Sequence, residues 1–217
     1  MKSEIVQTAD GSSTIFLPEI GEHYHSTYGA VQESMHVFLS SGLEKCSKTP
    51  LTIFEVGFGT GLNALLTADS HWAKEKKIHY ITVEKYPVSE TIWQQLQFPS
   101  GEPSLFEALH RSVWEAKTPI HHGFDLQKLQ GDLLTIDFRQ LQLFDLIYFD
   151  AFSPDKQPEL WSLAVFEKLY RQCNPEAVLV TYCAKGQVRR NMQQAGFVAE
   201  RLPGPPGKRE MLRGVKR

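Results

Sequence analysis

A short glycine-rich segment between an apolar run and an amphipathic run is the first place in this sequence where chemistry is expected. The segment reads Glu55-Val-Gly57-Phe-Gly59-Thr-Gly61. Closely spaced glycines allow a ligand to approach the backbone, and a helix that starts after them points its free N–H groups at that ligand. The segment therefore predicts a site for a polar or anionic ligand. A plain tight turn is the alternative.

The residues around this loop indicate which ligand is bound. A dinucleotide loop, G-x-G-x-x-G/A, needs a small sixth residue, and Leu62 occupies that place. The pattern acidic-x-G-x-G-x-G is instead typical of methyltransferases that bind S-adenosylmethionine. Glu84, which ends the next apolar run, is expected to accept hydrogen bonds from the ribose hydroxyls. Asp132 is expected beside the adenine amino group, and Glu55 close to the methionine amino group, directly or through intervening contacts.

A second candidate segment, Asp150-Ala-Phe152-Ser-Pro, follows the apolar run 144–149. Ligands of open α/β folds bind at the carboxyl ends of strands, so Asp150 is expected at a functional site. Phe152 and Trp161 offer flat surfaces on which a base can stack. The alternative is structural, with Asp150 as a helix cap and Phe152 as a core residue.

Charge is distributed unevenly along the chain. The 217 residues carry 23 Lys/Arg and 25 Asp/Glu, a net charge of −2. Residues 185–217 hold nine basic and two acidic side chains, which leaves the first 184 residues with a net charge of −9. A basic end on an acidic body predicts a polyanionic partner, and a solvated face is the alternative. The candidate phosphate contacts are Lys185, Arg189, Arg190, Lys208, Arg209 and Arg213.

Hydrophobic periodicity predicts the elements that position these residues. Apolar runs typical of strands cover 51–56, 78–84, 144–152 and 177–184, with shorter runs at 131–137, 197–202 and 211–215. The amphipathic run 62–74 predicts a helix after the glycine loop. Strands that alternate with helices indicate an α/β fold with a mostly parallel sheet covered on both faces. The run 211–215 is expected to pair antiparallel with 197–202.

The first fifty residues are predicted to form an extension packed on a core domain at 51–217. Apolar runs at 4–8 and 13–17 flank Asp10-Gly11, which favours a hairpin turn. A helix is expected over 29–42. The stretch 86–124 fits this plan least well and is expected to place helices over the strand ends.

Composition excludes several classes of protein. A 24.7 kDa chain with 41% hydrophobic and 22% charged residues has the apolar surface for one core, without a membrane helix or a signal peptide. A cytoplasmic protein is expected. Three cysteines without a C-x-x-C pair argue against a disulfide framework and a thiolate zinc site. The pairs His23/His25 and His121/His122 match no common zinc spacing, so no metal is expected.

Together these motifs resemble a known family. The segments EVGFGTGLN (55–63), EKYP (84–87), DAFSPDKQPELW (150–161), GQVRRNMQQAGF (186–197) and KREML (208–212) are similar to the methyltransferase domain of the MnmC/MnmD type. The resemblance covers essentially the whole chain. It implies a Rossmann-like class I methyltransferase fold, with a seven-stranded sheet whose last strand is antiparallel, and S-adenosylmethionine as cofactor.

The resemblance also implies roles for individual residues. The run 24–34, which includes Tyr28, would lie near the methionine end of the cofactor, and Arg209 near the target base or a phosphate. Asp150 would accept or orient the proton of the attacking amine. For the cofactor loop, the ribose, the adenine and the reacting centre, the implied residues are Gly57, Gly59, Gly61, Glu84, Asp132 and Asp150.

The activity implied is N-methylation of the 5-aminomethyl group of (2-thio)uridine at the tRNA wobble position, which gives 5-methylaminomethyl-2-thiouridine and makes the tRNA anticodon loop the partner. The better-known family version is fused to a flavin-dependent oxidase. This chain ends at Arg217 without one, so a separate enzyme is expected to supply the aminomethyl precursor. Two alternatives remain open: a spermidine-synthase-like aminopropyltransferase, and a non-catalytic module that binds tRNA or the cofactor.

Overall fold

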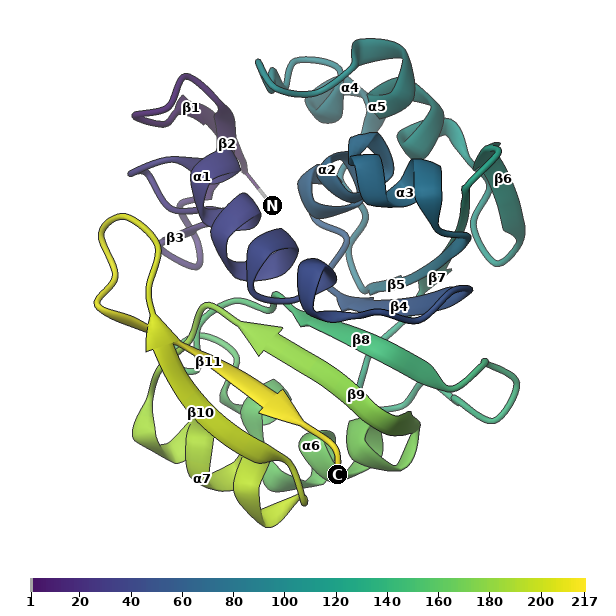
Figure 1. Cartoon of the computed structure of the whole chain (residues 1–217). Coiled ribbons are helices and arrows are strands. Elements are labelled where there is room, and N and C mark those ends of the chain that lie inside the picture. The colour runs from purple at the N-terminus through teal and green to yellow at the C-terminus, as the bar shows by residue number, and fades with distance from the viewer. Residues whose placement is uncertain (1) are drawn as a thin grey trace.

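The computed structural model describes residues 2–217 and places an eight-stranded sheet between two layers of helices (Figure 1). The strands are β4 (Leu51–Val56), β5 (Ile78–Glu84), β6 (Lys117–His121), β7 (Phe124–Gln130), β8 (Phe144–Phe149), β9 (Cys173–Thr181), β10 (Val198–Pro203) and β11 (Glu210–Val215). Their order across the sheet is β10-β11-β9-β8-β4-β5-β7-β6. The strands from β9 to β7 are parallel, whereas β11 is antiparallel to both of its neighbours. The α/β fold expected from the sequence is confirmed.

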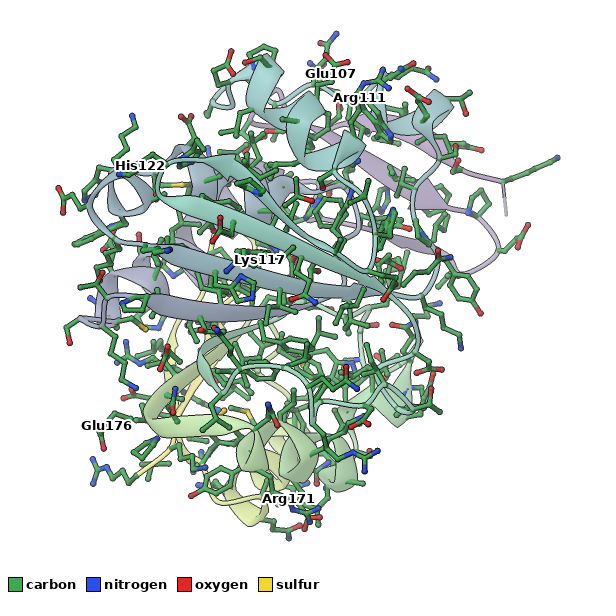
Figure 2. All side chains as sticks on the ribbon, turned by 90° about the vertical axis from the view of Figure 1, so that its right-hand side faces the viewer. Glu107, Arg111, Lys117, His122, Arg171 and Glu176 are labelled. Carbon is green, nitrogen blue, oxygen red and sulfur yellow. The ribbon has the colours of Figure 1, made fainter. Side chains whose placement is uncertain are left out.

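Helices cover both faces of the sheet. One face carries α1 (Ala30–Ser34), α2 (Leu62–Asp69), α3 (His71–Glu75), α4 (Glu90–Trp93) and α5 (Pro103–Arg111), and the other carries α6 (Leu163–Arg171) and α7 (Gly186–Gln194) (Figure 1). Two short 3-10 turns lie at Leu43–Lys45 and Pro158–Trp161. Figure 2 views the molecule from the β6 edge: Lys117 lies on the edge strand, with Arg111 of α5 above it and Arg171 of α6 below.

The central strands are apolar on both faces because helices cover both. All six residues of β4 are buried. Successive residues point to opposite faces, so Ile53 joins the core under α2 while Phe54 joins the core under α6. Phe54 stacks on Phe144 of β8 with ring centroids 4.3 Å apart. This packing holds the carboxyl ends of the strands, where the candidate residues lie, in fixed positions.

The N-terminal segment packs on the same core. The strands β1 (Glu4–Gln7), β2 (Ser13–Leu17) and β3 (Glu22–His23) form a separate antiparallel sheet, and the expected hairpin between β1 and β2 is confirmed. The helix expected over 29–42 is α1 continued by a π-helical turn at Met35–Ser40. From this turn Phe38 packs against Tyr148 of β8, with ring centroids 5.1 Å apart. The extension and the large sheet therefore share one apolar cluster.

Two expectations about the sheet are wrong. The sheet has eight strands rather than seven, because the stretch 86–124 contributes β6 in addition to helices. The strand expected at 131–137 lies instead at 124–130, and 131–137 forms turns. Polar residues hid this strand in the sequence. One of them, Lys128, is buried because its ammonium donates to the carbonyl oxygens of Leu109 (2.9 Å) and His110 (2.7 Å) at the end of α5.

A helix on one face of the sheet and the edge strand β6 are both interrupted. The helix expected over 62–74 is broken at Ser70, whose hydroxyl accepts the Ala73 amide and starts α3. At the edge of the sheet, β6 contains Pro119, and its pairing with β7 shifts register between Pro119 and His121. The edge strand is therefore short and irregular.

Candidate active site

The carboxyl ends of five parallel strands open into one cavity of about 610 Å³. The residues that follow these strands line it: Gly57 after β4, Glu84 at the end of β5, Asp132 after β7, Asp150 after β8 and Tyr182 after β9. Parallel strands bring their carboxyl ends to the same edge of a sheet, which is where open α/β folds bind ligands. The structure thus brings together the main residues that the sequence singled out.

The glycine loop runs along the wall of this cavity. Gly57 and Gly61 have positive φ angles of 88° and 76°, a conformation that favours glycine. A Cβ atom on Gly57 would lie 3.0 Å from the carbonyl oxygen of Asp150, so the loop passes directly against the end of β8. Gly61 caps the start of α2, and its amide donates to the Phe58 carbonyl oxygen (2.8 Å). A side chain at either position would strain the loop. Gly57 lines the cavity, whereas a Cβ atom on Gly61 would meet the rings of His110 (2.9 Å) and Phe58 (3.1 Å).

Two carboxylates on the next strands are held by hydrogen bonds. Glu84 accepts from the backbone amides of Gly59 (3.0 Å) and Tyr86 (2.8 Å). A carboxylate has about four acceptor sites, so two remain for hydroxyl groups in the cavity. Asp132 accepts from Lys85 Nζ (2.9 Å), and this hydrogen bond is the main cause of its lowered pKa. Both groups fit the nucleoside part of a ligand.

Asp150 lies where the glycine loop meets the rest of the cavity. Its carboxylate accepts a hydrogen bond from Asn63 Nδ2 (2.8 Å). Burial raises the pKa of Asp150 to about 7, and the negative charge of Glu33 adds to this effect. The Asn63 hydrogen bond and the positive charge of Lys208 oppose it. A carboxyl group with a pKa near neutrality exchanges a proton readily at physiological pH, which is a property of general bases.

Glu55 is close to the site but does not line the cavity. The residue is fully buried in β4, and neither of its carboxyl oxygens has a hydrogen-bond partner within residues 2–217. Burial raises the pKa of Glu55 well above its usual range, which favours the protonated form of the group. The side chain of Asn63 lies between this group and Asp150 and leaves its own Oδ1 atom unpaired within the same range. Asn63 thus lies next to both acidic groups, Glu55 and Asp150.

Aromatic side chains form the outer wall. Phe152 meets Tyr24 edge to face, with ring centroids 5.1 Å apart. Trp161 is buried, and its Nε1–H donates to the Phe152 carbonyl oxygen (2.8 Å), so its role is to fix the loop after Asp150. Tyr28 is 63% exposed at the rim of the cavity.

The basic residues expected to contact phosphate differ in their exposure and in their ion pairs. Arg190 and Arg209 are exposed and form no ion pair with any residue of 2–217, whereas Arg189 is half-buried. The other group is neutralised within the chain, because Lys185 pairs with Asp155 and Arg213 with Glu200. Lys208 differs from both groups: it lines the cavity and pairs with a buried carboxylate, Glu33.

Two cavity residues, Asn63 and Tyr182, were not assigned a role from the sequence. Two others, His25 and Glu33, belong to the run 24–34 that was expected near the methionine end of the cofactor. Asn63 follows Gly61 by two residues, and this position in the first turn of α2 was a signal available in the sequence. His25 Nε2 is hydrogen-bonded to Thr60 Oγ1 (2.7 Å), and burial lowers its pKa to about 4, so the ring is neutral. Glu33 and Tyr182 reach the cavity only through the tertiary fold.

Residues 2–217 contain neither a cluster of side chains that could hold a metal ion nor a helix that could span a membrane. In that range, no three His, Cys, Asp or Glu side chains gather in a way that could hold a metal ion. His121 Nε2, for example, is hydrogen-bonded to the Ala68 carbonyl oxygen (3.0 Å). Over the same residues, none of the helices has the length and apolar character needed to span a bilayer.

The parallel strands β9 to β7, the antiparallel β11 inserted beside β9 and the cavity at the strand ends define a class I methyltransferase fold. Residues 102–217 match the model of a family described as S-adenosyl-L-methionine-dependent methyltransferase. The chain belongs to this family, and S-adenosylmethionine is its cofactor.

Curated relatives support the expected resemblance. The chain is 36% identical over 216 residues to the "tRNA 5-methylaminomethyl-2-thiouridine biosynthesis bifunctional protein MnmC" of Ralstonia nicotianae, covering 91% of this chain and 32% of the relative. A protein of the same name from Ectopseudomonas mendocina is 34% identical over 220 residues, covering 89% of this chain and 32% of the relative. The chain therefore spans about a third of the length of the curated relatives it matches.

Solved structures agree with the fold. The crystal structure of MNMC2 from Aquifex aeolicus has a TM-score of 0.84 and 28% identity, covering 98% of this chain and 70% of that chain. The spermidine synthase of Thermotoga maritima has a TM-score of 0.60 at 10% identity, covering 100% of this chain and 72% of that chain. The second likeness concerns the fold alone. The predicted resemblance to the MnmC type is confirmed.

Proposed function

We propose that this chain transfers a methyl group from S-adenosylmethionine to the 5-aminomethyl nitrogen of (2-thio)uridine at the wobble position of tRNA, which gives 5-methylaminomethyl-2-thiouridine. The named relatives support this substrate, because their names refer to the biosynthesis of that nucleoside in tRNA. In this proposal the anticodon loop is the partner, and a separate enzyme supplies the aminomethyl precursor.

The observation that carries the proposal is the position of Asp150 in an acidic cavity. Its backbone carbonyl contacts the glycine loop, and its carboxyl group lines the cavity. Carboxyl groups outnumber lysines in the lining, which favours a cationic amine over an anionic substrate. The acidic residues of the lining are Glu22, Glu33, Glu84, Asp132, Asp150 and Glu159, and the lysines are Lys85, Lys156 and Lys208.

The residues of the chain would act as follows. Gly57, Gly59 and Gly61 hold the cofactor against the loop, and Glu84 accepts hydrogen bonds from its ribose. When bound, the cofactor supplies an electrophilic methyl group on a sulfonium sulfur. Asp150 accepts a proton from the substrate ammonium and leaves a nitrogen lone pair. The nitrogen lone pair would then take the methyl group from the sulfonium, which would leave as a neutral thioether. Phe152 excludes water from the aligned pair.

Deprotonation of the amine and alignment of the reactants can be compared as free energies. An amine with a pKa of about 10.4, as in lysine, needs roughly 4–5 kcal/mol to be neutral at pH 7. Alignment of two bound reactants can contribute about 7–11 kcal/mol. Alignment therefore contributes more than deprotonation costs, and a positioned base removes part of that cost. Asp150, as the base, acts on the deprotonation cost, which is the smaller of the two quantities.

The test is methyl transfer from labelled S-adenosylmethionine to tRNA that carries 5-aminomethyl-2-thiouridine. We expect label in that nucleoside after digestion, and none in the same tRNA with unmodified uridine or after RNase treatment. A parallel reaction with a diamine and decarboxylated S-adenosylmethionine tests the aminopropyltransferase alternative. Transfer to the diamine, or no transfer to the aminomethyl tRNA, would refute the proposal. Cofactor binding without any transfer would favour the non-catalytic module.

A further inference from the structure

A lysine ammonium is held inside the cavity by a carboxylate and an aromatic ring. Lys208 Nζ pairs with Glu33 Oε1 and lies 3.8 Å from the ring centroid of Tyr182. All three side chains line the same cavity as Asp150. A carboxylate beside an aromatic face is the arrangement that recognises an ammonium ion. Glu33 and Tyr182 therefore form an ammonium site, and Lys208 fills it.

The two walls of this site are fixed. Glu33 Oε2 accepts the backbone amide of Ser26 (2.9 Å), and the Glu33 side chain is only 8% exposed. The Tyr182 hydroxyl donates to the Ala151 carbonyl oxygen (2.9 Å), which ties the ring to the residue after Asp150. A carboxylate this buried is costly without a positive partner. Lys208 provides that partner when no substrate is present.

Lys208 itself can leave without moving its loop. The loop between β10 and β11 is anchored by its backbone: the Lys208 amide donates to the Pro205 carbonyl oxygen (2.9 Å), and His36 Nε2 is 2.8 Å from the Pro203 carbonyl oxygen. The Lys208 side chain is 33% exposed and has a flexible four-carbon stem. Its ammonium can therefore swing to solvent while the backbone stays in place.

The ammonium site borders both Asp150 and the glycine loop. Tyr182 follows β9, which is next to β8 and Asp150 in the sheet. Glu33 and Lys208 face His25, whose Nε2 is hydrogen-bonded to Thr60 Oγ1 of the glycine loop (2.7 Å). A nitrogen held by Glu33 and Tyr182 therefore lies near both Asp150 and the loop that holds the cofactor, and a transfer between two bound reactants requires such proximity.

We propose that the aminomethyl ammonium of the substrate replaces the Lys208 ammonium on Glu33 and Tyr182, so that Lys208 is an internal stand-in for the substrate amine. This inference rests on the proposed function and adds the group that recognises the amine. A single buried carboxylate neutralises one ammonium, so binding of the substrate releases Lys208. We call the set Glu33, Phe152, Tyr182 and Lys208 the amine side of the cavity.

The test compares two tRNAs bound to Lys208→Met in the presence of S-adenosylhomocysteine. One tRNA carries 5-aminomethyl-2-thiouridine and the other carries 2-thiouridine at the same position. We expect the variant to bind the aminomethyl tRNA at least about threefold more tightly than the unaltered chain, and the other tRNA no more tightly. A gain in affinity on loss of a positive charge is the reverse of what a phosphate contact gives, because removal of a phosphate contact weakens both tRNAs.

Two further variants complete the experiment. Arg209→Met removes a charge from the same loop, at an exposed side chain without an ion pair in the described chain, and is expected to treat both tRNAs alike. Glu33→Gln keeps the size of the side chain and is expected to bind the aminomethyl tRNA about tenfold more weakly, down to the level of the other tRNA. This second variant still tests the inference if Lys208→Met does not fold.

Three outcomes would overturn the inference. They are an equal loss of affinity for both tRNAs in Lys208→Met, retained discrimination in Glu33→Gln, and a loss of S-adenosylhomocysteine affinity in Lys208→Met measured by calorimetry. The last outcome would mean that Lys208 serves the cofactor. Failure of the proposed function is distinguishable, since the unaltered chain would then transfer no methyl group to the aminomethyl tRNA.

Discussion

The two sides of the cavity are built by different means. On the cofactor side, which consists of Gly57, Gly59, Gly61, Glu84 and Asp132, every residue lies in or directly after a strand end, and backbone amides hold Glu84. The amine side combines residues from α1, from the loops after β8 and β9, and from the loop between β10 and β11. Glu33 and Lys208 are 175 residues apart in the chain. Each residue of the cofactor side is thus placed by the strand that precedes it, whereas the amine side depends on α1 meeting the loop between β10 and β11.

The largest effect is expected at Asp150, where the two sides meet. We expect Asp150→Asn to lower kcat by roughly 10²–10⁴-fold, the range typical of a general base, with S-adenosylhomocysteine affinity nearly unchanged. Transfer of labelled methyl groups over a time course measures kcat, and calorimetry measures the affinity for S-adenosylhomocysteine. The matched control is Asp145→Asn at the other end of β8, where the carboxylate pairs with Lys48 (2.7 Å). This control should lower stability but not kcat. Near-normal turnover in Asp150→Asn would remove Asp150 from the mechanism.

The next effect separates the cofactor side from the amine side. Glu84→Ala is expected to weaken S-adenosylhomocysteine binding by roughly 10–100-fold, because hydrogen bonds to charged groups contribute about 1.5–3 kcal/mol. Affinity for tRNA should change little. Glu90→Ala is the control, since Glu90 forms surface contacts with Arg111 (2.8 Å) and Gln94 (3.0 Å). If both variants bound the cofactor product equally well, Glu84 would have no role in holding the ribose.

The pH dependence of kcat/KM is a second test of Asp150. Asp150 faces Glu33 and Lys208, and burial raises the pKa of Asp150 to about 7. We expect kcat/KM to rise with pH up to about 7 and then to level, because only the ionised carboxylate accepts a proton. This inflection should disappear in Asp150→Asn. An unchanged profile in the variant would assign the inflection to another group.

The raised pKa of Asp150 also affects the free energy of unfolding. The pKa of Asp150 in the folded protein lies above the unfolded value near 3.8, so folding favours its protonated form. Stability from this group is therefore complete below pH 3.8 and falls as the pH rises to about 7, by about 1.4 kcal/mol per unit. Above pH 7 we expect Asp150→Asn to be more stable than the unaltered chain in urea denaturation. Lower stability at that pH would contradict the burial argument.

The smallest effect concerns the surface around the amine side. Arg190→Gln removes an exposed charge, and we expect the slope of log affinity for tRNA against log salt to become shallower by about one. Arg139→Gln is the control, because Arg139 is exposed before β8 at the opposite end of the sheet. Equal slopes in both variants would place the tRNA elsewhere.

The contrast between the two sides also explains what the sequence could predict. The glycine loop, Glu84 and Asp150 follow apolar runs, so their place at the strand ends followed from the pattern alone. The charge of Lys208 was visible, and a phosphate contact was expected, but its pairing with Glu33 depends on α1 meeting the β10–β11 loop. No local pattern encodes that meeting.

The same limit applies to the fold. The strand β7 was misplaced because a lysine in its sequence, Lys128, predicts an exposed position. In the structure, the carbonyl groups at the end of α5 accept hydrogen bonds from the Lys128 ammonium inside the core. The edge strand β6 was missed because Pro119 and the polar residues around it resemble a loop. The error at β7 arises because a distant element satisfies a group that the local sequence leaves unsatisfied.

The irregular β6 strand affects more than the topology. Pro119 lacks an amide hydrogen, and the register shift beside it turns the remaining groups out of line. The opposite border, β10, carries Glu200 and Arg201 and ends at Pro203. An irregular strand at one border, and charged residues with a terminal proline at the other, disfavour pairing with a second molecule. We therefore expect little edge-to-edge association of the large sheet.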